Sequence, residues 1–302
     1  MDAYIPLWVL GSFFLVVGAV VGSFLNVLIF RLPEGLSVVT PRSRCPHCSV
    51  PIKAHDNIPI VSWLILGGRC RSCKEAISVR YPVVEAICAL LFLLVFFKAS
   101  SIPETDPWSF VIVAMHGMVL TALLLAVTMI DLDHFIIPDV LSMPGFLVGL
   151  GFAFVGSSAT GVSWQQAALG ALLGSSFLLV VAMSYKWVRG REGMGMGDVK
   201  LMTTIGAFLG AYAIPFVIFS AALQGTILAL LWALFLRKSP SGEAHSPEDM
   251  PNDATSDPEG DGVEAEPMGL ATLQVPFGPF LALGALEWYL FSDVLRTFFP
   301  ML

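Results

Sequence analysis

Charged residues are scarce in this chain. They form 13% of its 302 residues, whereas 56% are hydrophobic and the mean hydropathy is +0.79. A soluble domain usually has about 25% charged and about 45–50% apolar residues, so the composition excludes an ordinary soluble protein and predicts an all-α polytopic membrane protein. A membrane helix needs roughly 20 apolar residues. About eight segments approach this length, at 6–30, 81–97, 109–130, 136–157, 164–185, 199–212, 214–236 and 273–297.

Two details of these segments affect the count and the amino terminus. The sixth segment is short and rich in glycine, and Pro215 either joins it to the seventh segment or breaks the two apart. The sequence therefore leaves open whether there are seven spans or eight.

The amino terminus carries Asp2 and no basic cluster, and its apolar run exceeds the h-region of about 7–15 residues of a cleaved signal. We therefore expect a retained first helix, and Arg31 after it favours an amino terminus outside the cytoplasm.

The basic residues predict the orientation. With eight spans and an outside start, the cytoplasmic segments are 31–80, 131–135, 186–200 and 237–272. Of the 16 Lys and Arg residues, only Lys98 and Arg296 lie outside these segments. This distribution follows the positive-inside rule.

Basic residues are absent from 239–267, which contains nine acids and accounts for the net charge of −7. The stretch is rich in Pro, Ser and Gly and poor in large apolar residues, a composition typical of disorder. We expect a disordered cytoplasmic loop at 237–272 with no catalytic role. The chain has no internal repeat, and we expect no nucleic-acid partner.

Cysteine is rare as well, yet four of the five cysteines form two Cys-x-x-Cys pairs, Cys45/Cys48 and Cys70/Cys73. Two such pairs can supply four thiolates to one tetrahedral zinc ion, so the spacing predicts a closed structural zinc site that folds the loop. The alternatives are free thiols or two disulfides, and a reducing cytoplasm disfavours disulfides. His47 and His55 are possible substitute ligands, and Cys88 in the second span is expected to serve packing.

Two aspartates stand at the edges of apolar segments. Asp131 ends the run from Val119 to Ile130, and Asp198 follows three alternate glycines at 193–197. A carboxylate at the edge of hydrocarbon is costly and therefore a functional candidate, and the predicted topology places both on the cytoplasmic side. For Asp198 the alternative is a helix N-cap.

Nearby polar residues have simpler explanations. We expect Asp139 to cap the helix after Pro138 and Asp133 and His134 to be interfacial. Lys200 is a candidate partner for phospholipid phosphate or for the nearby aspartate.

If Asp131 and Asp198 meet across helices, they would share one proton, because two like charges so close cannot both ionise cheaply. The ionised member would take a proton from water, and the water would attack a peptide carbonyl while the protonated member stabilises the oxyanion. The hypothesis is peptide-bond hydrolysis at the membrane edge. The alternatives are a proton-coupled transporter and a non-enzymatic assembly factor, although a transporter would be expected to carry acids near mid-membrane and on both sides.

A set of motifs in this order resembles the type IV prepilin peptidases. The motifs are Gly22-Ser-Phe-Leu-Asn-Val-Leu-Ile-Phe-Arg-Leu-Pro33, the double Cys-x-x-Cys loop, Arg80-Tyr-Pro-Val-Val-Glu85, Ile130-Asp131 through Pro138-Asp139, Gly195-x-Gly-Asp198 and Pro276-Phe-Gly-Pro-Phe280. The resemblance covers essentially the whole chain except the acidic insert at 239–267. It implies a Gly-x-Gly-Asp intramembrane aspartic protease of the bacterial inner membrane, with Asp131 and Asp198 as the catalytic pair and the four cysteines as zinc ligands.

The resemblance also implies substrates and a second activity. Such enzymes remove the leaders of type IV prepilins and type II secretion pseudopilins after a glycine on the cytoplasmic side. Many of them N-methylate the new amino terminus with S-adenosylmethionine. The chain has no Rossmann glycine fingerprint, so the residues themselves assign no site to the methyl donor. Asn26 and Glu85 either orient substrate or bond helix to helix.

On this basis the chain divides into five regions. They are a first transmembrane helix at 1–30, a cytoplasmic zinc loop domain at 31–80, a transmembrane protease core at 81–236, the acidic loop at 237–272, and a last transmembrane helix with the carboxyl terminus at 273–302. Membrane lipid is the expected surrounding, and the sequence leaves the oligomeric state open.

Overall fold

The computed structural model describes residues 6–101, 107–190, 193–238 and 276–298. The described residues are all-helical apart from loops and two isolated β-bridges in the cysteine loop, Arg44 with Pro51 and Arg69 with Ala76. The expected disordered loop at 237–272 lies almost wholly outside the described residues.

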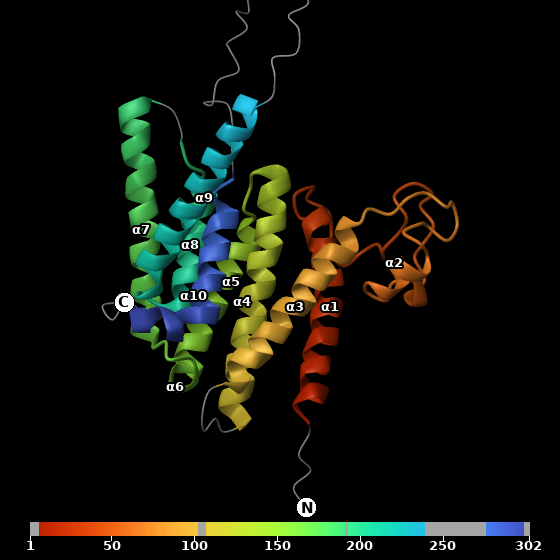
Figure 1. Ribbon diagram of the computed structural model, residues 1–302, viewed down its shortest axis with the longest axis horizontal. Helices are drawn as coiled ribbons and strands as arrows, with labels where there is room; N and C mark the ends of the chain where they lie inside the picture. The colour runs from red at the N-terminus through yellow and green to blue at the C-terminus, as the bar shows by residue number, and fades with distance from the viewer. Residues whose placement is uncertain (1–5, 102–106, 191–192, 239–275, 299–302) are drawn as a thin grey trace, which may run out of the picture. The chain divides into compact units, whose positions relative to one another are not determined.

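Each of the eight predicted apolar segments forms a helix (Figure 1). The helices are α1 (Leu7–Arg31), α3 (Arg80–Ser100), α4 (Pro107–His134), α5 (Asp139–Val155), α7 (Trp164–Arg189), α8 (Met196–Leu209), α9 (Ala213–Lys238) and α10 (Gly278–Phe298). Three shorter helices were not predicted: η1 (Ala54–Asp56), α2 (Val61–Ile65) and α6 (Ser157–Thr160).

Five helices are long and apolar enough to cross a membrane, which identifies a multi-pass membrane protein. They are α1, α3, α4, α7 and the part of α9 from Ala213 to Leu234. Helix α5 is apolar but has only 17 residues, and α8 has 14. The prediction of about eight helices therefore holds for the helices themselves, whereas the described residues support five full-length spans.

The sixth and seventh segments are separate helices, and Gly210 separates them. Gly210 adopts φ 79° and ψ 176°, a backbone conformation that is strained for residues with a Cβ atom. Pro215 lies in the first turn of α9, where its missing N–H has no intrahelical partner to lose. Of the two alternatives left open, the structure thus has two separate helices, and Pro215 lies inside the second one rather than between them.

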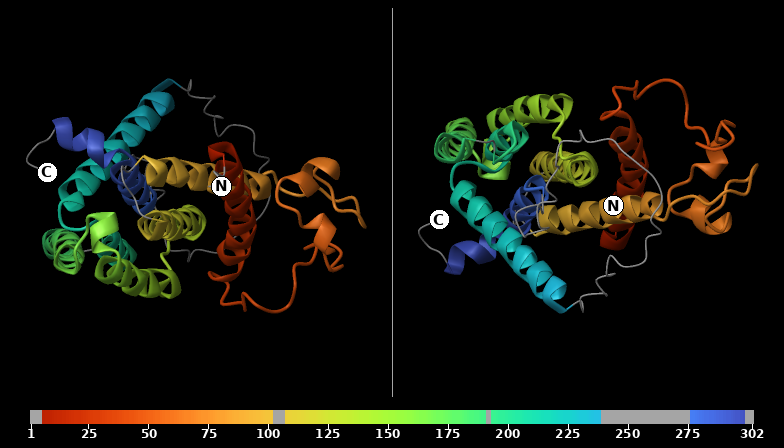
Figure 2. Two further views of the ribbon diagram at one scale, coloured as in Figure 1. Left: turned by 90° about the horizontal axis from the view of Figure 1, so that it is seen from below. Right: turned by 90° about the horizontal axis from the view of Figure 1, so that it is seen from above.

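The described chain falls into two units. The first contains residues 1–221 and 276–302, and the second, 222–275, is described only as the continuation of α9 to Lys238. In the first unit α1 packs on α3 and α3 on α4, while α8 packs against α5, α7 and α10 (Figures 1 and 2). The larger apolar core lies among α4, α8 and α10 and includes Leu124, Leu201 and Leu281.

Small residues bring these helices together. A Cβ atom on Gly18 or Gly22 of α1 would lie 2.7 Å from a backbone Cα of α3. Gly206 of α8 approaches Gly170 of α7 even more closely, because its Cβ would lie 2.3 Å from the carbonyl carbon of that glycine. Close backbone approach through glycine is typical of membrane helices.

Candidate active site and metal centre

Asp131 lies in the last turn of α4 with an exposed fraction of only 4%. Its Oδ2 atom accepts a hydrogen bond from the backbone N–H of Gly278, at 3.1 Å. Gly278 is the first residue of α10, so the start of α10 holds one oxygen of this carboxyl group.

Asp198 lies in the first turn of α8 and is also buried, with an exposed fraction of 8%. Gly195 occupies the N-cap position and α8 begins at Met196, so Asp198 is not the cap and the helix does not start near Val199. The Asp131 carboxyl group is among the groups that act electrostatically on Asp198. The structure therefore brings the two predicted acids close enough to interact, one from the end of a helix and one from the beginning of another.

Ile137 connects the surroundings of the two acids. A Cβ atom on Gly197 would lie 3.0 Å from the Cβ of Ile137, and a Cβ on Gly278 would lie 3.2 Å from its Cδ1. The same Cβ on Gly278 would lie 2.5 Å from Asp131 Oδ2. Because no side chain fits there, glycine at 278 allows α10 to reach the carboxyl group.

The sequence analysis does not predict the role of Gly278, although a signal is present. Gly278 stands in Pro276-Phe-Gly-Pro-Phe280, a motif that contributed to the resemblance. Nothing in the sequence alone relates this motif to Asp131, which is 147 positions away.

Two ion pairs surround the buried acids. Arg80 pairs with Asp133 and also donates to the carbonyl of Met129, at 3.2 Å, which joins α3 to α4. Lys200 donates to Asp139 Oδ1 at 2.6 Å, which joins α8 to α5. Such partly exposed pairs contribute about 0–1 kcal/mol each to stability.

These contacts correct two expectations. Asp139 is the first residue of α5 and not its cap, since Pro138 holds the N-cap position without a side-chain hydrogen bond. Lys200 pairs with Asp139 rather than with the acid two residues before it. Asp133 is exposed, as expected, and in addition pairs with Arg80.

Asn26 and Glu85 both make contacts within the protein. The Asn26 amide donates to the carbonyl of Tyr81 at 3.1 Å, which joins α1 to α3, as the helix-bonding alternative predicts. Glu85 of α3 instead accepts the backbone N–H of Ile60 at 2.7 Å. Glu85 therefore fastens the loop region, defined here as residues 32–79, to a membrane-spanning helix.

The four paired cysteines form one cluster. Their sulfur atoms all lie within 4.8 Å of one another, and the sulfurs of Cys45 and Cys73 are 3.8 Å apart. Zinc–sulfur bonds of about 2.3 Å in tetrahedral geometry imply sulfur–sulfur distances of about 3.8 Å, whereas a disulfide would be about 2.05 Å long. The residues fit a zinc ion, and neither His47 nor His55 belongs to the cluster.

The two cysteine pairs have matching backbone turns. Ser49 N–H donates to the Cys45 carbonyl and Lys74 N–H to the Cys70 carbonyl, and Ser49 and Lys74 both have positive φ, of 56° and 62°. Backbone N–H groups of Cys73 and Ser72 donate to the Cys70 sulfur and lower its pKa to about 6. Such donors stabilise a thiolate, the form in which cysteine binds a metal.

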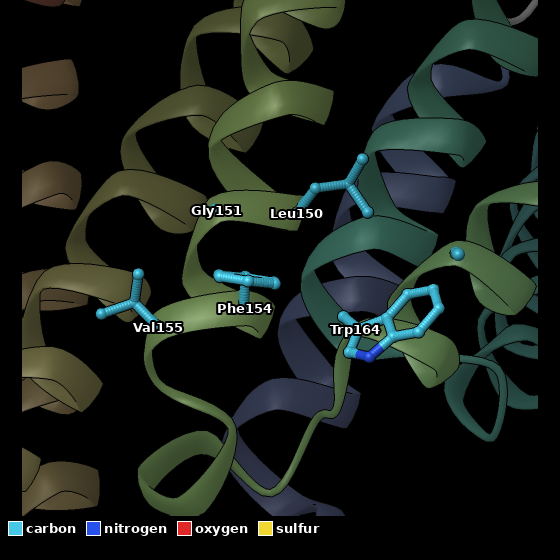
Figure 3. Close-up of a pocket in the computed structure, with 6 residues that line it drawn as sticks. Leu150, Gly151, Phe154, Val155 and Trp164 are labelled. Atoms are coloured by element: carbon cyan, nitrogen blue, oxygen red, sulfur yellow. The ribbon is translucent and has the colours of Figure 1, made fainter.

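A shallow pocket elsewhere on the molecule has no polar chemistry. It lies between the end of α5 and the start of α7 (Figure 3). Its lining consists of Leu150, Gly151, Phe154, Val155, Trp164 and Ala168. Because α5 begins beside the two acids at Asp139, this pocket lies at the opposite end of that helix and is separate from the candidate active site.

Comparison with known proteins gives a consistent family. Residues 16–99 match the bacterial peptidase A24 N-terminal domain, and residues 118–230, which contain both buried acids, match the type IV leader peptidase family. A relative from Neisseria gonorrhoeae, named prepilin leader peptidase/N-methyltransferase, is 38% identical over 240 residues, covering 72% of this chain and 80% of its own. A relative of the same name from Myxococcus xanthus is 35% identical, and the match covers 95% of this chain and 92% of the relative. Another from Stutzerimonas stutzeri is 34% identical, and the match covers 92% of this chain and 90% of the relative. No solved structure is significantly similar. The chain belongs to the prepilin leader peptidase/N-methyltransferase family.

Proposed function

We propose that this protein removes the leader peptides of type IV prepilins and type II secretion pseudopilins and N-methylates the new amino terminus. The observation that carries the peptidase assignment is the pair of buried, interacting carboxyl groups, Asp131 and Asp198. A single buried acid of this kind would be explained by packing or capping. Two at adjoining helix ends match the requirements of an aspartic protease.

The proposed reaction uses one proton shared by the pair. The ionised carboxyl group takes a proton from a water molecule while the water oxygen forms a bond to the carbonyl carbon of the scissile peptide. The protonated carboxyl group gives its proton to the carbonyl oxygen, and collapse of the tetrahedral intermediate breaks the C–N bond as the departing nitrogen takes up a proton. Because the two groups titrate as a pair, neither is assigned as the permanent base.

The start of α10 contributes positioning in this scheme. The Gly278 N–H holds Oδ2 of Asp131, so the carboxyl group is oriented before substrate arrives. Preorganised orientation of this kind is a large part of enzymatic rate enhancement. The ion pairs of Asp133 and Asp139 hold the neighbouring helices around this arrangement.

Two cofactors accompany the proposal. Cys45, Cys48, Cys70 and Cys73 would hold a structural zinc ion that stabilises the loop region, which has little apolar core. S-adenosylmethionine would supply the methyl group. The methyltransferase assignment is supported by the names of the relatives, and no residue of this chain is assigned to the methyl donor.

The proposed location is the bacterial cytoplasmic membrane, with the amino terminus outside and the acids facing the cytoplasm. This orientation is supported by the positions of the basic residues, because both the loop region and the segment before Asp198 are rich in Lys and Arg.

Mass spectrometry of a prepilin co-expressed with the protein tests both activities. Loss of the leader and a gain of one methyl group are expected with the wild-type chain. Asp131→Asn and Asp198→Asn should each leave the leader intact in a protein that still inserts, while Asp133→Asn, outside the pair, should retain cleavage. Full cleavage by either of the first two variants would overturn the assignment of the pair.

A further inference from the structure

Helix α2 presents three large apolar side chains to the outside of the loop region. Val61, Leu64 and Ile65 have exposed fractions of 47%, 64% and 75%. Exposure of neighbouring large aliphatic residues is unusual on a water-facing surface and marks a place where something apolar is bound.

The apolar face is fixed in place by the other residues of α2. The Ser62 hydroxyl donates to the carbonyl of His55 at 2.9 Å and accepts the N–H of Ile58 at 3.0 Å. The Trp63 indole N–H donates to the carbonyl of Ile77 at 3.1 Å. Because the side chains of Ser62 and Trp63 are bonded to the loop region, the opposite face of α2, with Val61, Leu64 and Ile65, points away from it.

A hydrogen bond ties the start of α2 to helix α3. Ile60, the residue before α2, donates its N–H to Glu85 Oε2 at 2.7 Å. Glu85 lies five residues after the start of α3, or about 7.5 Å along the helix axis at about 1.5 Å per residue. The residue before α2 therefore lies beside the first turns of α3, which is a candidate membrane span. Figure 1 shows α2 level with the first part of α3 rather than beyond its end.

The loop region also carries exposed basic side chains. Five of its Lys and Arg residues form no ion pair with another described residue: Arg42, Arg44, Lys53, Arg69 and Lys74. Of its acids, Asp56 is already bound by two N–H groups of Arg71. Residues 32–79 hold six Lys and Arg residues against three acids. A short apolar face in a region with this basic excess matches the interface of an anionic leaflet, where apolar side chains reach the acyl boundary and basic ones meet phosphate.

We propose that Val61, Leu64 and Ile65 of α2 insert into the adjacent membrane leaflet and anchor the cysteine loop region on an anionic lipid surface. A protein partner fits less well, since stable protein interfaces bury about 1,200–2,000 Å² and three side chains on a five-residue helix offer far less. A lipid surface requires no minimum patch of this kind. The anchor would fix the height of the loop region above the membrane independently of any catalytic step.

Photo-crosslinking of the full-length protein in lipid vesicles tests this anchor. The photoreactive residue p-benzoylphenylalanine replaces Ile65 in one variant and the exposed Ser72, which lies between Cys70 and Cys73, in the control. After illumination in vesicles of phosphatidylethanolamine and phosphatidylglycerol, mass spectrometry should find lipid adducts at position 65 at least about fivefold above those at position 72. Vesicles without the anionic lipid should give fewer adducts at position 65.

Other adducts would overturn the proposal. A crosslink from position 65 mainly to a second copy of the chain would identify a protein interface, and equal lipid yields at positions 65 and 72 would show that α2 has no special contact with lipid. Zinc content measured on both variants verifies that the loop region is folded. A Leu64→Gln, Ile65→Gln variant supplies a second measurement. Hydrogen exchange of α2 in the same vesicles should be faster in this variant than in the wild type, and equal exchange rates in the two proteins would overturn the anchor.

Discussion

Replacing Gly278 by alanine is expected to misplace the carboxyl group of Asp131. The new Cβ would lie 2.5 Å from Asp131 Oδ2 and 3.2 Å from both its Cγ and the Cδ1 of Ile137. Real Cβ atoms essentially never approach a heavy atom within 3.0 Å, so the carboxyl group or the start of α10 must move by at least about 0.5 Å. The hydrogen bond from the backbone N–H to Oδ2, now 3.1 Å long, cannot keep its geometry through that movement.

The expected loss of activity follows from two estimates. A hydrogen bond to a charged group contributes about 1.5–3 kcal/mol, which corresponds to roughly 10–100-fold in rate. A misplacement of about 1 Å at a reacting group can itself cost about 10²-fold. We therefore expect the kcat for prepilin cleavage by Gly278→Ala to fall roughly 10–100-fold with little change in KM, because the substrate-binding surface is otherwise unaltered.

Steady-state cleavage of a purified prepilin by the purified protein measures this effect. Gly151→Ala is the matched control, because a Cβ at that position meets nothing within 4 Å and alanine is favoured over glycine inside a helix by about 1 kcal/mol. Thermal unfolding of both variants separates a local effect from general destabilisation. If Gly278→Ala is as stable as the wild type and cleaves within about threefold of its rate, the positioning role of Gly278 is refuted.

Three further results are expected around the acids and the loop region. Gly197→Ala should slow cleavage about tenfold because its Cβ would lie 3.0 Å from the Cβ of Ile137. Gly195→Ala should stay within about threefold of the wild-type rate, because its Cβ would lie no nearer than 3.9 Å to any neighbouring heavy atom. Equal kinetic effects of the two variants would contradict this steric ranking. Cys48→Ser or a zinc chelator should lower the metal content and make the loop region sensitive to limited proteolysis, and undiminished protease resistance of metal-free protein would remove the structural role of the ion. Glu85→Leu should lower the free energy of unfolding by about 1–3 kcal/mol because it leaves a backbone N–H unpaired, and Glu85→Gln, which retains an acceptor oxygen, should lose less in a denaturant titration.

The helices could be predicted from the sequence because their cause is local. An apolar run long enough to cross hydrocarbon must satisfy its own backbone hydrogen bonds, and a helix does so without partners. The five segments long enough to cross a membrane are helices for this reason, and the other three predicted segments are helical as well. Their exact ends depend on turn geometry, and the separation of α8 from α9 at Gly210 rather than at Pro215 reflects a backbone conformation that composition does not reveal.

The metal cluster was predictable for a similar reason. Each of the two short turns holds two of the four ligands, and the Cys-x-x-Cys spacing alone brings the two sulfur atoms of a turn together. Only the approach of one turn to the other, seen in the contact of Cys45 with Cys73, depends on the tertiary fold. The contacts of the ion-pairing residues were not predictable, because Asp139 finds Lys200 across 61 positions of sequence and Glu85 finds Ile60 across 25. A polar residue near a helix end has several local explanations, and tertiary packing decides among them.

The arrangement at the acids gives a physical meaning to the two glycines of Gly195-x-Gly-Asp198. The structure gives the two glycines different surroundings. Gly195 supplies the extended N-cap conformation, with φ −72° and ψ 143°, and has space around it. Gly197 is the one pressed against Ile137. Because Ile137 also touches Gly278, the distance between the starts of α8 and α10 depends on one isoleucine between two glycines. The separation of the two carboxyl groups follows from that packing, since Asp198 is carried by the first of these helices and Asp131 is held by the second.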